Sequence, residues 1–184
     1  MAEPKKQALD SVVTPEFRLS FPHLYDPEDK NGRVRYSLSM IFPPTADLGP
    51  LKVAIRAAVL AKFPPPAAIP KGLKNPIRSG DEVDWDGYAG NMFASARNQD
   101  QPGLVDERCQ QIVDRKKLYA GCWCRAFVQA YWYDKEGGKG VALSLKHVQF
   151  IRDDQPFTSR VKAEDVFTAV EGPAIVPAGD EFFS

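Results

Sequence analysis

The chain has 184 residues, with 24 basic and 24 acidic side chains, so its formal net charge is zero. This length suits one domain with long loops and a tail, and it allows a buried core without disulfide bridges. A hydrophobic content of 43% with 11% aromatic residues excludes a wholly disordered chain. The first residues do not resemble a signal peptide, and no apolar run is as long as a membrane span. We therefore expect a soluble protein.

The three cysteines indicate the redox compartment. Their number is odd, and Cys122 and Cys124 are only two residues apart, where a bridge along one strand would be strained. Free thiols are the better interpretation, and they are typical of proteins that act in a reducing cytoplasm.

The first patterned segments predict an antiparallel hairpin. Apolar residues occupy the odd positions of residues 13–21, and the same period of two returns, on even positions, over residues 33–42. The turn-rich stretch between them contains Asn31-Gly32, a strong hairpin signal. Polar or basic residues occupy the other face of both strands.

A helix is expected over residues 48–62, with Asp47 or Thr45 as its N-cap. Pro50 then falls in the first turn, where a missing amide hydrogen has no helical acceptor to lose. A long loop over residues 64–90 follows, rich in proline early and in acidic residues later. Loops of this length in compact domains are usually functional or disordered.

The rest of the chain has a mainly β pattern. A short strand is expected over residues 91–97, and an irregular stretch with some strand over residues 104–113. The strongest β signal covers residues 121–134 and passes through the glycine-rich turn KEGGKG into residues 140–153. After that, only a short helix over residues 163–170 is expected. Several curved strands with one inserted helix favour a small β-barrel over a doubly wound sheet.

The two faces of residues 122–132 differ in a way that indicates a binding surface, because successive strand side chains point to opposite sides. The even positions are small and apolar apart from Trp132, and suit a barrel interior. The odd positions alternate rings with a guanidinium and an amide: Trp123, Arg125, Phe127, Gln129, Tyr131 and Tyr133. Rings stack on unpaired bases at roughly 1–3 kcal/mol each, and arginine neutralises phosphate. Alternatively, a loop, the helix or a second subunit covers these rings.

Further aromatic and basic residues support a nucleic-acid-binding surface. Phe93, Ser95 and Arg97 share one face of their short strand. Lys135 and Lys139 flank the glycine-rich turn. The long loop adds five more candidates: Lys71, Lys74, Arg78, Trp85 and Tyr88. Its two aromatic residues are expected to fold over a bound strand, and its charges to follow a phosphate backbone, so that affinity falls as salt rises. Each lysine by itself is more often ordinary surface.

Four segments occur in an order that resembles a known family. They read SFPHLYDP, NPIRSGDEVDWDGYAGNMFASA, LYAGCWCRAFVQAYWYDKEGGKGVALSLKHVQFIRDDQPF and RVKAEDVF, and the resemblance spans roughly residues 14–170. The family is that of bacteriophage single-stranded-DNA-binding proteins. The resemblance implies an OB-type antiparallel β-barrel and a sequence-independent role in phage replication and recombination in the bacterial cytoplasm. OB barrels usually carry their helix later than residues 48–62. We expect neither a cofactor nor an enzymatic activity.

Two other interpretations involve metals. Five side chains are candidate zinc ligands: Cys109, Cys122, Cys124, His23 and His147. Two of these cysteines lie mid-strand on a core-like face, and no repeated C-x₂₋₄-C pair is present. The acidic loop offers carboxylates for a magnesium-dependent nuclease: Asp81, Glu82, Asp84 and Asp86. No lysine or histidine constellation accompanies them as a general base, so an ordinary solvated loop is favoured. A barrel that assembles only with protein partners is a third interpretation.

The C-terminal end differs in charge from the rest of the chain. Residues 153–184 hold seven acidic side chains against two basic ones, so the preceding part has the opposite excess. An acidic, aromatic tip ends the chain: Asp180, Glu181, Phe182 and Phe183. By resemblance this tip would dock replication or recombination enzymes, and it would compete with DNA for a basic groove because both are anionic. An ordinary frayed terminus is the alternative.

We therefore expect a flexible N-terminus over residues 1–12, an OB-type DNA-binding domain over residues 13–170 and an acidic tail over residues 171–184. The expected partners are single-stranded DNA and replication or recombination proteins, with a homodimer left open and no membrane contact. The expected DNA contacts are Trp123, Arg125, Phe127, Tyr131, Tyr133, Phe93, Arg97, Trp85, Tyr88, Lys71, Lys74, Arg78 and Lys139.

Overall fold

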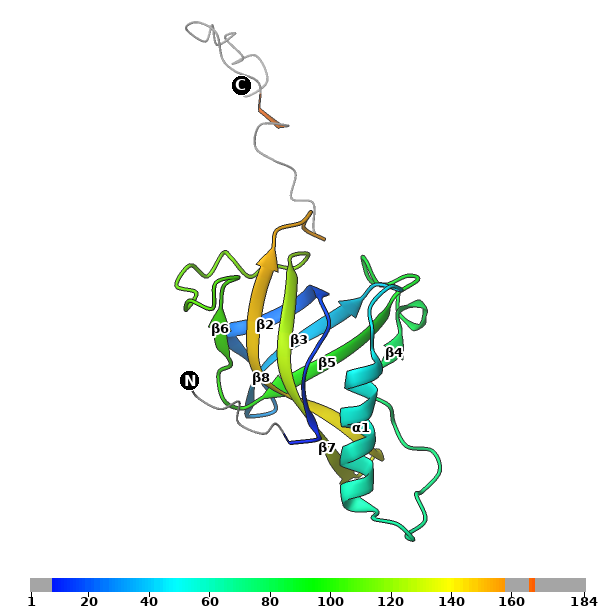
Figure 1. Cartoon of the computed structure of the whole chain (residues 1–184). Coiled ribbons are helices and arrows are strands. Elements are labelled where there is room, and N and C mark those ends of the chain that lie inside the picture. The colour runs from blue at the N-terminus through cyan, green and yellow to red at the C-terminus, as the bar shows by residue number, and fades with distance from the viewer. Residues whose placement is uncertain (1–7, 158–165, 168–184) are drawn as a thin grey trace, which may run out of the picture.

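A computed structural model describes residues 8–157 and 166–167 (Figure 1). The elements are β1 (Ser11–Val13), β2 (Phe17–Lys30), β3 (Arg33–Phe42), α1 (Gly49–Lys62), β4 (Arg78–Ser79), the 3₁₀ turn η1 (Gly80–Glu82), β5 (Met92–Asn98), β6 (Gly103–Val105), β7 (Trp123–Lys135) and β8 (Gly138–Arg152). The tail expected over residues 171–184 and most of the helix expected over residues 163–170 lie outside the described residues. Within the described part, no helix is both long and apolar enough to cross a membrane.

Five strands close into a barrel. Around the ring, β7 pairs with β2, β2 with β3, β3 with β5, β5 with β8, and β8 again with β7. All of these pairs are antiparallel except β5–β8, which is parallel. Strand β1 lies beside β7, and β6 lies beside β8. A closed five-stranded ring of this kind is the OB-type barrel that the sequence predicts.

Alternate positions of the strands fill the barrel interior. The even positions of β7 from Cys124 to Ala130 are buried, as the sequence predicts, and so is Cys122 just before the strand. From the neighbouring strands, the rings of Phe17 and Phe42 meet edge to face with their centroids 5.9 Å apart. Because strand side chains alternate between faces, the period of two in the sequence correctly predicts the inner face of β7.

The helix α1 is inserted between the second and third barrel strands and runs along the side of the barrel (Figure 1). It packs against β7, β1 and β8. As predicted, Pro50 lies in the first turn. The N-cap prediction is wrong: the N-cap is Leu48, not Asp47 or Thr45, and no side chain caps the helix. Asp47, one residue earlier, accepts a hydrogen bond through Oδ1 from the Gly49 amide at 2.9 Å. One apolar stripe of the helix is buried: Leu51, Ala54 and Ala58.

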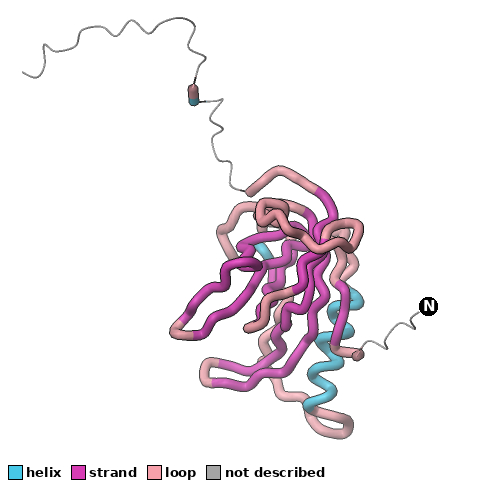
Figure 2. Tube along the Cα trace, turned by 90° about the vertical axis from the view of Figure 1, so that its left-hand side faces the viewer, coloured by secondary structure: helices cyan, strands magenta, loops and turns pink. Residues whose placement is uncertain are grey.

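Two long hairpins extend from the barrel. The β2–β3 hairpin turns at Asn31 and Gly32, whose φ angles of 57° and 73° are those that an Asn-Gly turn requires. The β7–β8 hairpin turns at Glu136 and Gly137, within the predicted KEGGKG segment. Figure 2 shows two hairpins that project from the same side of the molecule. The barrel surface between them is therefore flanked by chain on both sides.

Some predicted boundaries are wrong. Residues 13–21 belong to two strands, β1 and β2, separated by a short break. Strand β2 continues to Lys30 through the segment expected to be a turn, because two β-bulges let it bend. Of residues 104–113, only the end of β6 is regular strand, with one further bridge to Gln111. Strand β1 begins at Ser11, inside the range 1–12 that the sequence predicts to be a flexible N-terminus.

Candidate nucleic-acid interface

A polar groove crosses the outer face of β3 and β5, between the two hairpins. Its floor is formed by side chains of both strands: Arg35, Ser37, Ser39, Ser95 and Arg97. Strand register places Ser37 opposite Arg97 and Ser39 opposite Ser95, and the two serine hydroxyls are hydrogen-bonded at 3.0 Å. The main hollow has a volume of about 490 Å³, and two adjoining hollows continue it toward β7 and β8. Arg97 lines all three, and we call this surface the β3–β5 groove.

The β3–β5 groove is cationic. Arg33, Arg35 and Arg97 line it, and within the described part of the chain none of the three forms an ion pair. Across the groove, Tyr131 and Lys135 of β7 share a hollow with Arg35 and Arg97. Guanidinium groups without a carboxylate partner in a concave surface attract an anionic polymer.

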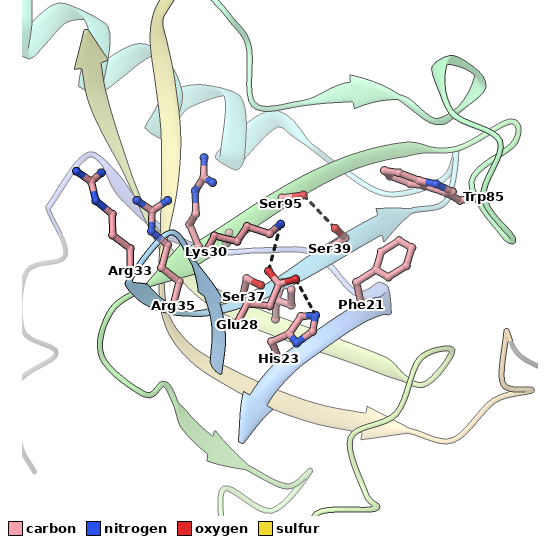
Figure 3. A pocket seen from close by; sticks show the side chains of 13 residues that line it. Phe21, His23, Glu28, Lys30, Arg33, Arg35, Ser37, Ser39, Trp85 and Ser95 are labelled. Atoms are coloured by element: carbon pink, nitrogen blue, oxygen red, sulfur yellow. Dashed lines mark hydrogen bonds and ion pairs between the residues drawn. The ribbon is translucent and has the colours of Figure 1, made fainter. Parts of the chain in front are cut away.

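Two half-exposed aromatic rings lie at one end of the groove (Figure 3). Phe21 and Trp85 are 50% and 48% exposed, and their ring centroids are 5.2 Å apart. Phe21 has a φ angle of 44°, which is uncommon for an aromatic residue, at the first bulge of β2. Behind Trp85, the buried rings of Tyr88 and Phe93 lie 5.2 Å and 6.3 Å away and support the indole.

One carboxylate lies among the cations of the groove. Glu28 contacts His23 Nε2 and Lys30 Nζ, each at 3.5 Å (Figure 3). The β2–β3 register jumps from the pair His23 and Ser37 to the pair Glu28 and Arg35, and this bulge brings His23 and Glu28 together. Among the described residues that line the main hollow, Glu28 is the only acid. The main hollow therefore contains one carboxylate acceptor.

The outer face of β7, the predicted binding platform, is divided between two environments. Its C-terminal end borders the groove through Tyr131 and Tyr133. At its N-terminal end, Trp123 Nε1 donates a hydrogen bond to Asp154 Oδ2 at 2.7 Å, and the Arg152 guanidinium lies over the indole, 4.4 Å from the centroid. At about 3.3 Å per residue, Trp123 is about 33 Å along the strand from Tyr133. Only the tyrosine end of β7 reaches the groove.

Ion pairs offset the charges around Trp123. Glu16 accepts hydrogen bonds from Arg152 and, at 3.4 Å, from Arg125. The hydrogen bond from Arg152 is the main reason that the pKa of Glu16 lies below its ordinary value. The hydrogen bond from Trp123 is the main reason that the pKa of Asp154 is lowered. Both carboxylates are therefore charged at neutral pH, which makes this surface less attractive to phosphate than the groove.

Three aromatic residues of the predicted site already pack against other side chains. Tyr88 and Phe93 are 0% and 4% exposed and form a small second cluster with Ile41. The loop that precedes β5 folds back over this strand, and its Tyr88 ring covers the outward ring of Phe93. Phe127 is half-buried and stacks on His147 with the ring centroids 6.1 Å apart. The prediction that Tyr88 and Phe93 offer faces to bases therefore needs correction, since they support Trp85 instead.

The basic residues of the long loop have different surroundings. Lys74 Nζ donates a hydrogen bond to the Gly137 carbonyl at 2.7 Å and so ties the loop to the β7–β8 turn. Arg78 pairs with Glu82 at 3.0 Å. Both Lys74 and Arg78 line the hollow on the β8 side of the groove. The two other predicted lysines are exposed: Lys71 and Lys139.

Sequence reasoning missed Arg33, Arg35 and Phe21 as site residues. The alternation over residues 33–42 correctly places arginines and serines on one outward face, but such a face is typical of any half-exposed strand. Only the pairing of β3 with β5 brings it beside Arg97. The alternation over residues 13–21 predicts that Phe21 points inward, because a period of two in the sequence gives no sign of a β-bulge.

The acidic loop is part of the scaffold. Asp81 Oδ1 accepts a hydrogen bond from the Gly90 amide at 2.8 Å, and Glu82 pairs with Arg78. Asp84 and Asp86 line a neighbouring hollow that shares Trp85 and Phe21 with the main hollow of the groove. No group of three or more His, Cys, Asp or Glu side chains in the described ranges is arranged to hold a metal ion. The nuclease and zinc interpretations therefore gain no support from this loop or from the buried Cys122 and Cys124.

Comparisons with known proteins point to one family. The family model described as the single-stranded-DNA-binding protein of Enterobacter phage Enc34 matches residues 10–175. Protein p50 of Acyrthosiphon pisum secondary endosymbiont phage 1 is 33% identical over 161 residues, which cover 77% of this chain and 83% of that protein.

Two solved structures share the fold. The single-stranded DNA-binding protein from bacteriophage Enc34, in complex with single-stranded DNA, has a TM-score of 0.68 and 22% identity, covering 84% of this chain and 97% of that chain. The protein gp2.5 of bacteriophage T7, a single-stranded DNA binding protein, has a TM-score of 0.53 and 16% identity, covering 83% and 97%. On the match of the family model over most of its length, this chain belongs to the Enc34 family of phage single-stranded-DNA-binding proteins.

Proposed function

We propose that this protein binds single-stranded DNA in the β3–β5 groove, largely without regard to sequence, and protects and organises it during phage replication and recombination. The observation that carries the proposal is the pair Arg35 and Arg97. These guanidinium groups have no ion pair among the described residues and lie between aromatic rings at both ends of the groove. Membership of the family supports the ligand class.

The groove offers the aromatic surfaces on which unpaired bases stack. Phe21 and Trp85 offer ring surface at one end, and Tyr131 offers it at the other. Each base stacked on such a ring contributes roughly 1–3 kcal/mol, whatever its identity. Stacking needs a free base face, which paired bases inside a duplex do not offer. The groove therefore favours unpaired DNA and tolerates any sequence.

The position of the groove also suits the fold. OB barrels bind oligonucleotides on the face of their second and third strands, flanked by the loops that join strands one to two and four to five. In this barrel those strands are β3 and β5, and those loops are the tips of the β2–β3 and β7–β8 hairpins. This supports the groove, and not the Trp123 end of β7, as the principal contact surface.

We further propose that the protein has no nuclease activity and acts in the bacterial cytoplasm, where its three free thiols are stable. Labelled single-stranded DNA incubated with the protein and magnesium or manganese should remain intact. Metal-dependent degradation that Asp84→Ala abolishes would restore the nuclease interpretation.

The acidic tip is proposed to dock replication or recombination proteins and to compete with DNA. Asp180, Glu181, Phe182 and Phe183 lie outside the described residues, so this proposal rests on their chemistry. The described barrel segment ends at Phe157, which lines a hollow together with Phe21 and Trp85. This hollow adjoins the aromatic end of the groove.

A gel-shift series with matched single-stranded and duplex DNA at two salt concentrations tests the proposed function. We expect the single strand to bind more tightly, with an affinity that falls as salt rises. The double variant Arg35→Ala, Arg97→Ala should weaken binding. Equal affinity for duplex, or unchanged affinity in the double variant, would argue against the β3–β5 groove as the site.

A further inference from the structure

The β3–β5 groove has two chemically distinct sides. Arg35 and Arg97 mark the side formed by β3 and β5, and within the described chain neither forms an ion pair. The β2 side carries Phe21, His23 and Glu28, and Lys30 at its end pairs with Glu28 (Figure 3). Phosphates are attracted to the guanidinium side and repelled by the Glu28 carboxylate. A strand bound in the groove would therefore turn its bases toward β2.

The Glu28 carboxylate retains acceptor capacity. A carboxylate has about four lone-pair sites. The ion-pair contacts of Glu28 to His23 and Lys30 are both 3.5 Å long, and neither has hydrogen-bond geometry. Its side chain is 35% exposed and lines the groove. Although Glu28 lies opposite Arg35 in the strand register, the two do not form an ion pair within 4.0 Å.

We propose that Glu28 reads one base edge in the groove and favours bases that present an exocyclic amine. This inference rests on the proposed function, that the groove binds single-stranded DNA. The amine of cytosine donates hydrogen bonds to a carboxylate, whereas uracil and thymine present a carbonyl oxygen at the same ring position, which a carboxylate repels. Stacking on Phe21 or Trp85 ignores base identity, so Glu28 adds a modest preference to otherwise sequence-independent binding.

Oligo-dC and oligo-dU provide the cleanest test, because they differ at the exocyclic position and the adjacent ring nitrogen, without the methyl group of thymine. Fluorescence anisotropy on the full-length protein should give a higher affinity for dC₁₂ relative to dU₁₂ in the wild type than in Glu28→Gln. The ratio of the two affinities should fall about fivefold in Glu28→Gln, the size expected of one specific base contact, because an amide both donates and accepts.

The quantity to compare between the wild type and the variant is the ratio of the affinity for dC₁₂ to the affinity for dU₁₂. Removing the Glu28 charge will raise the affinity for any DNA, and self-stacking differs between the two oligonucleotides, but both effects cancel when the ratio of the variant is set against that of the wild type. Glu107→Gln is the matched control, since Glu107 pairs with Lys117 and lines no part of the groove. Its ratio should equal that of the wild type.

The outcomes separate this inference from the proposed function. If the wild type binds neither oligonucleotide, the proposed function itself fails. If Glu28→Gln keeps the wild-type ratio, base reading by Glu28 is refuted while the DNA-binding groove stands. A melting temperature for Glu28→Gln close to that of the wild type will show that the variant is folded.

Discussion

Removing the positive charge of Arg97 should change the salt dependence of DNA binding by a defined amount. Arg97 lines all three hollows of the groove and has no ion pair within the described residues, so it is the residue expected to meet a phosphate. For single strands, log K falls with log salt with a slope of about −0.7 for each phosphate neutralised. Arg97→Ala should therefore reduce the slope by about 0.7. If the salt-independent part of the affinity is unchanged, binding weakens about fivefold at 0.1 M salt and about fifteenfold at 0.02 M.

The double variant Arg35→Ala, Arg97→Ala should double this effect, with a slope reduced by about 1.4 and binding weakened about 25-fold at 0.1 M salt. Anisotropy titrations of labelled oligo-dT at four salt concentrations measure the slope directly. Arg56→Ala is the matched control, because Arg56 is exposed on α1 and lines none of the groove hollows. A slope that is unchanged in the Arg97 variant, or equally changed in the Arg56 variant, would refute the assignment of phosphate contacts to the groove.

Three further outcomes are expected. Trp85→Ala should weaken DNA binding about 5- to 150-fold through lost stacking, while Trp123→Ala leaves the affinity nearly unchanged. If anisotropy titrations show the larger loss for Trp123→Ala, the DNA-binding site lies at the N-terminal end of β7 and not in the groove. Deleting residues 171–184 should leave the melting temperature unchanged and tighten DNA binding, and weaker binding would contradict competition by the tail. Glu16→Gln should lower the melting temperature at neutral pH, because the lowered pKa of Glu16 contributes stability that is complete above the ordinary glutamate pKa of about 4.3 and is lost as the pH falls toward the lower pKa of the folded state. Thermal melts at pH 7 and pH 3 should show this difference narrowing in acid, and a difference that persists at pH 3 would mean that the Arg152 hydrogen bond is not its source.

The elements with strong local signals were predictable from the sequence. The Asn31-Gly32 and KEGGKG turns, the helix ending at Lys62 and the buried even face of β7 all agree with the structure. Each depends on interactions between residues close in sequence: a turn that needs positive φ, an apolar stripe on a helix, a strand that alternates. Local backbone sterics and side-chain periodicity determine these features, so a short stretch of sequence is enough to predict them.

The candidate site was only partly predictable, because residues far apart in sequence build it. Arg97 and Tyr131 reach the groove as the composition of their strands indicates. Trp123, on the same face of β7 as Tyr131, is instead engaged by Arg152 and Asp154. The aromatic pattern of one strand does not reveal which of its rings will find partners within the protein.

The sequence by itself determined the mainly β architecture, the two hairpins, the inserted helix and the inward face of β7. Only the tertiary structure decided that the outer faces of β3 and β5 form one groove, that a bulge turns Phe21 out toward Trp85, and that the loop before β5 covers Phe93. The physical reason is that barrel closure pairs strands across long separations, such as Ser39 with Ser95, and the free energy of that closure comes from packing over the whole barrel. No local pattern encodes which neighbour a strand face will meet.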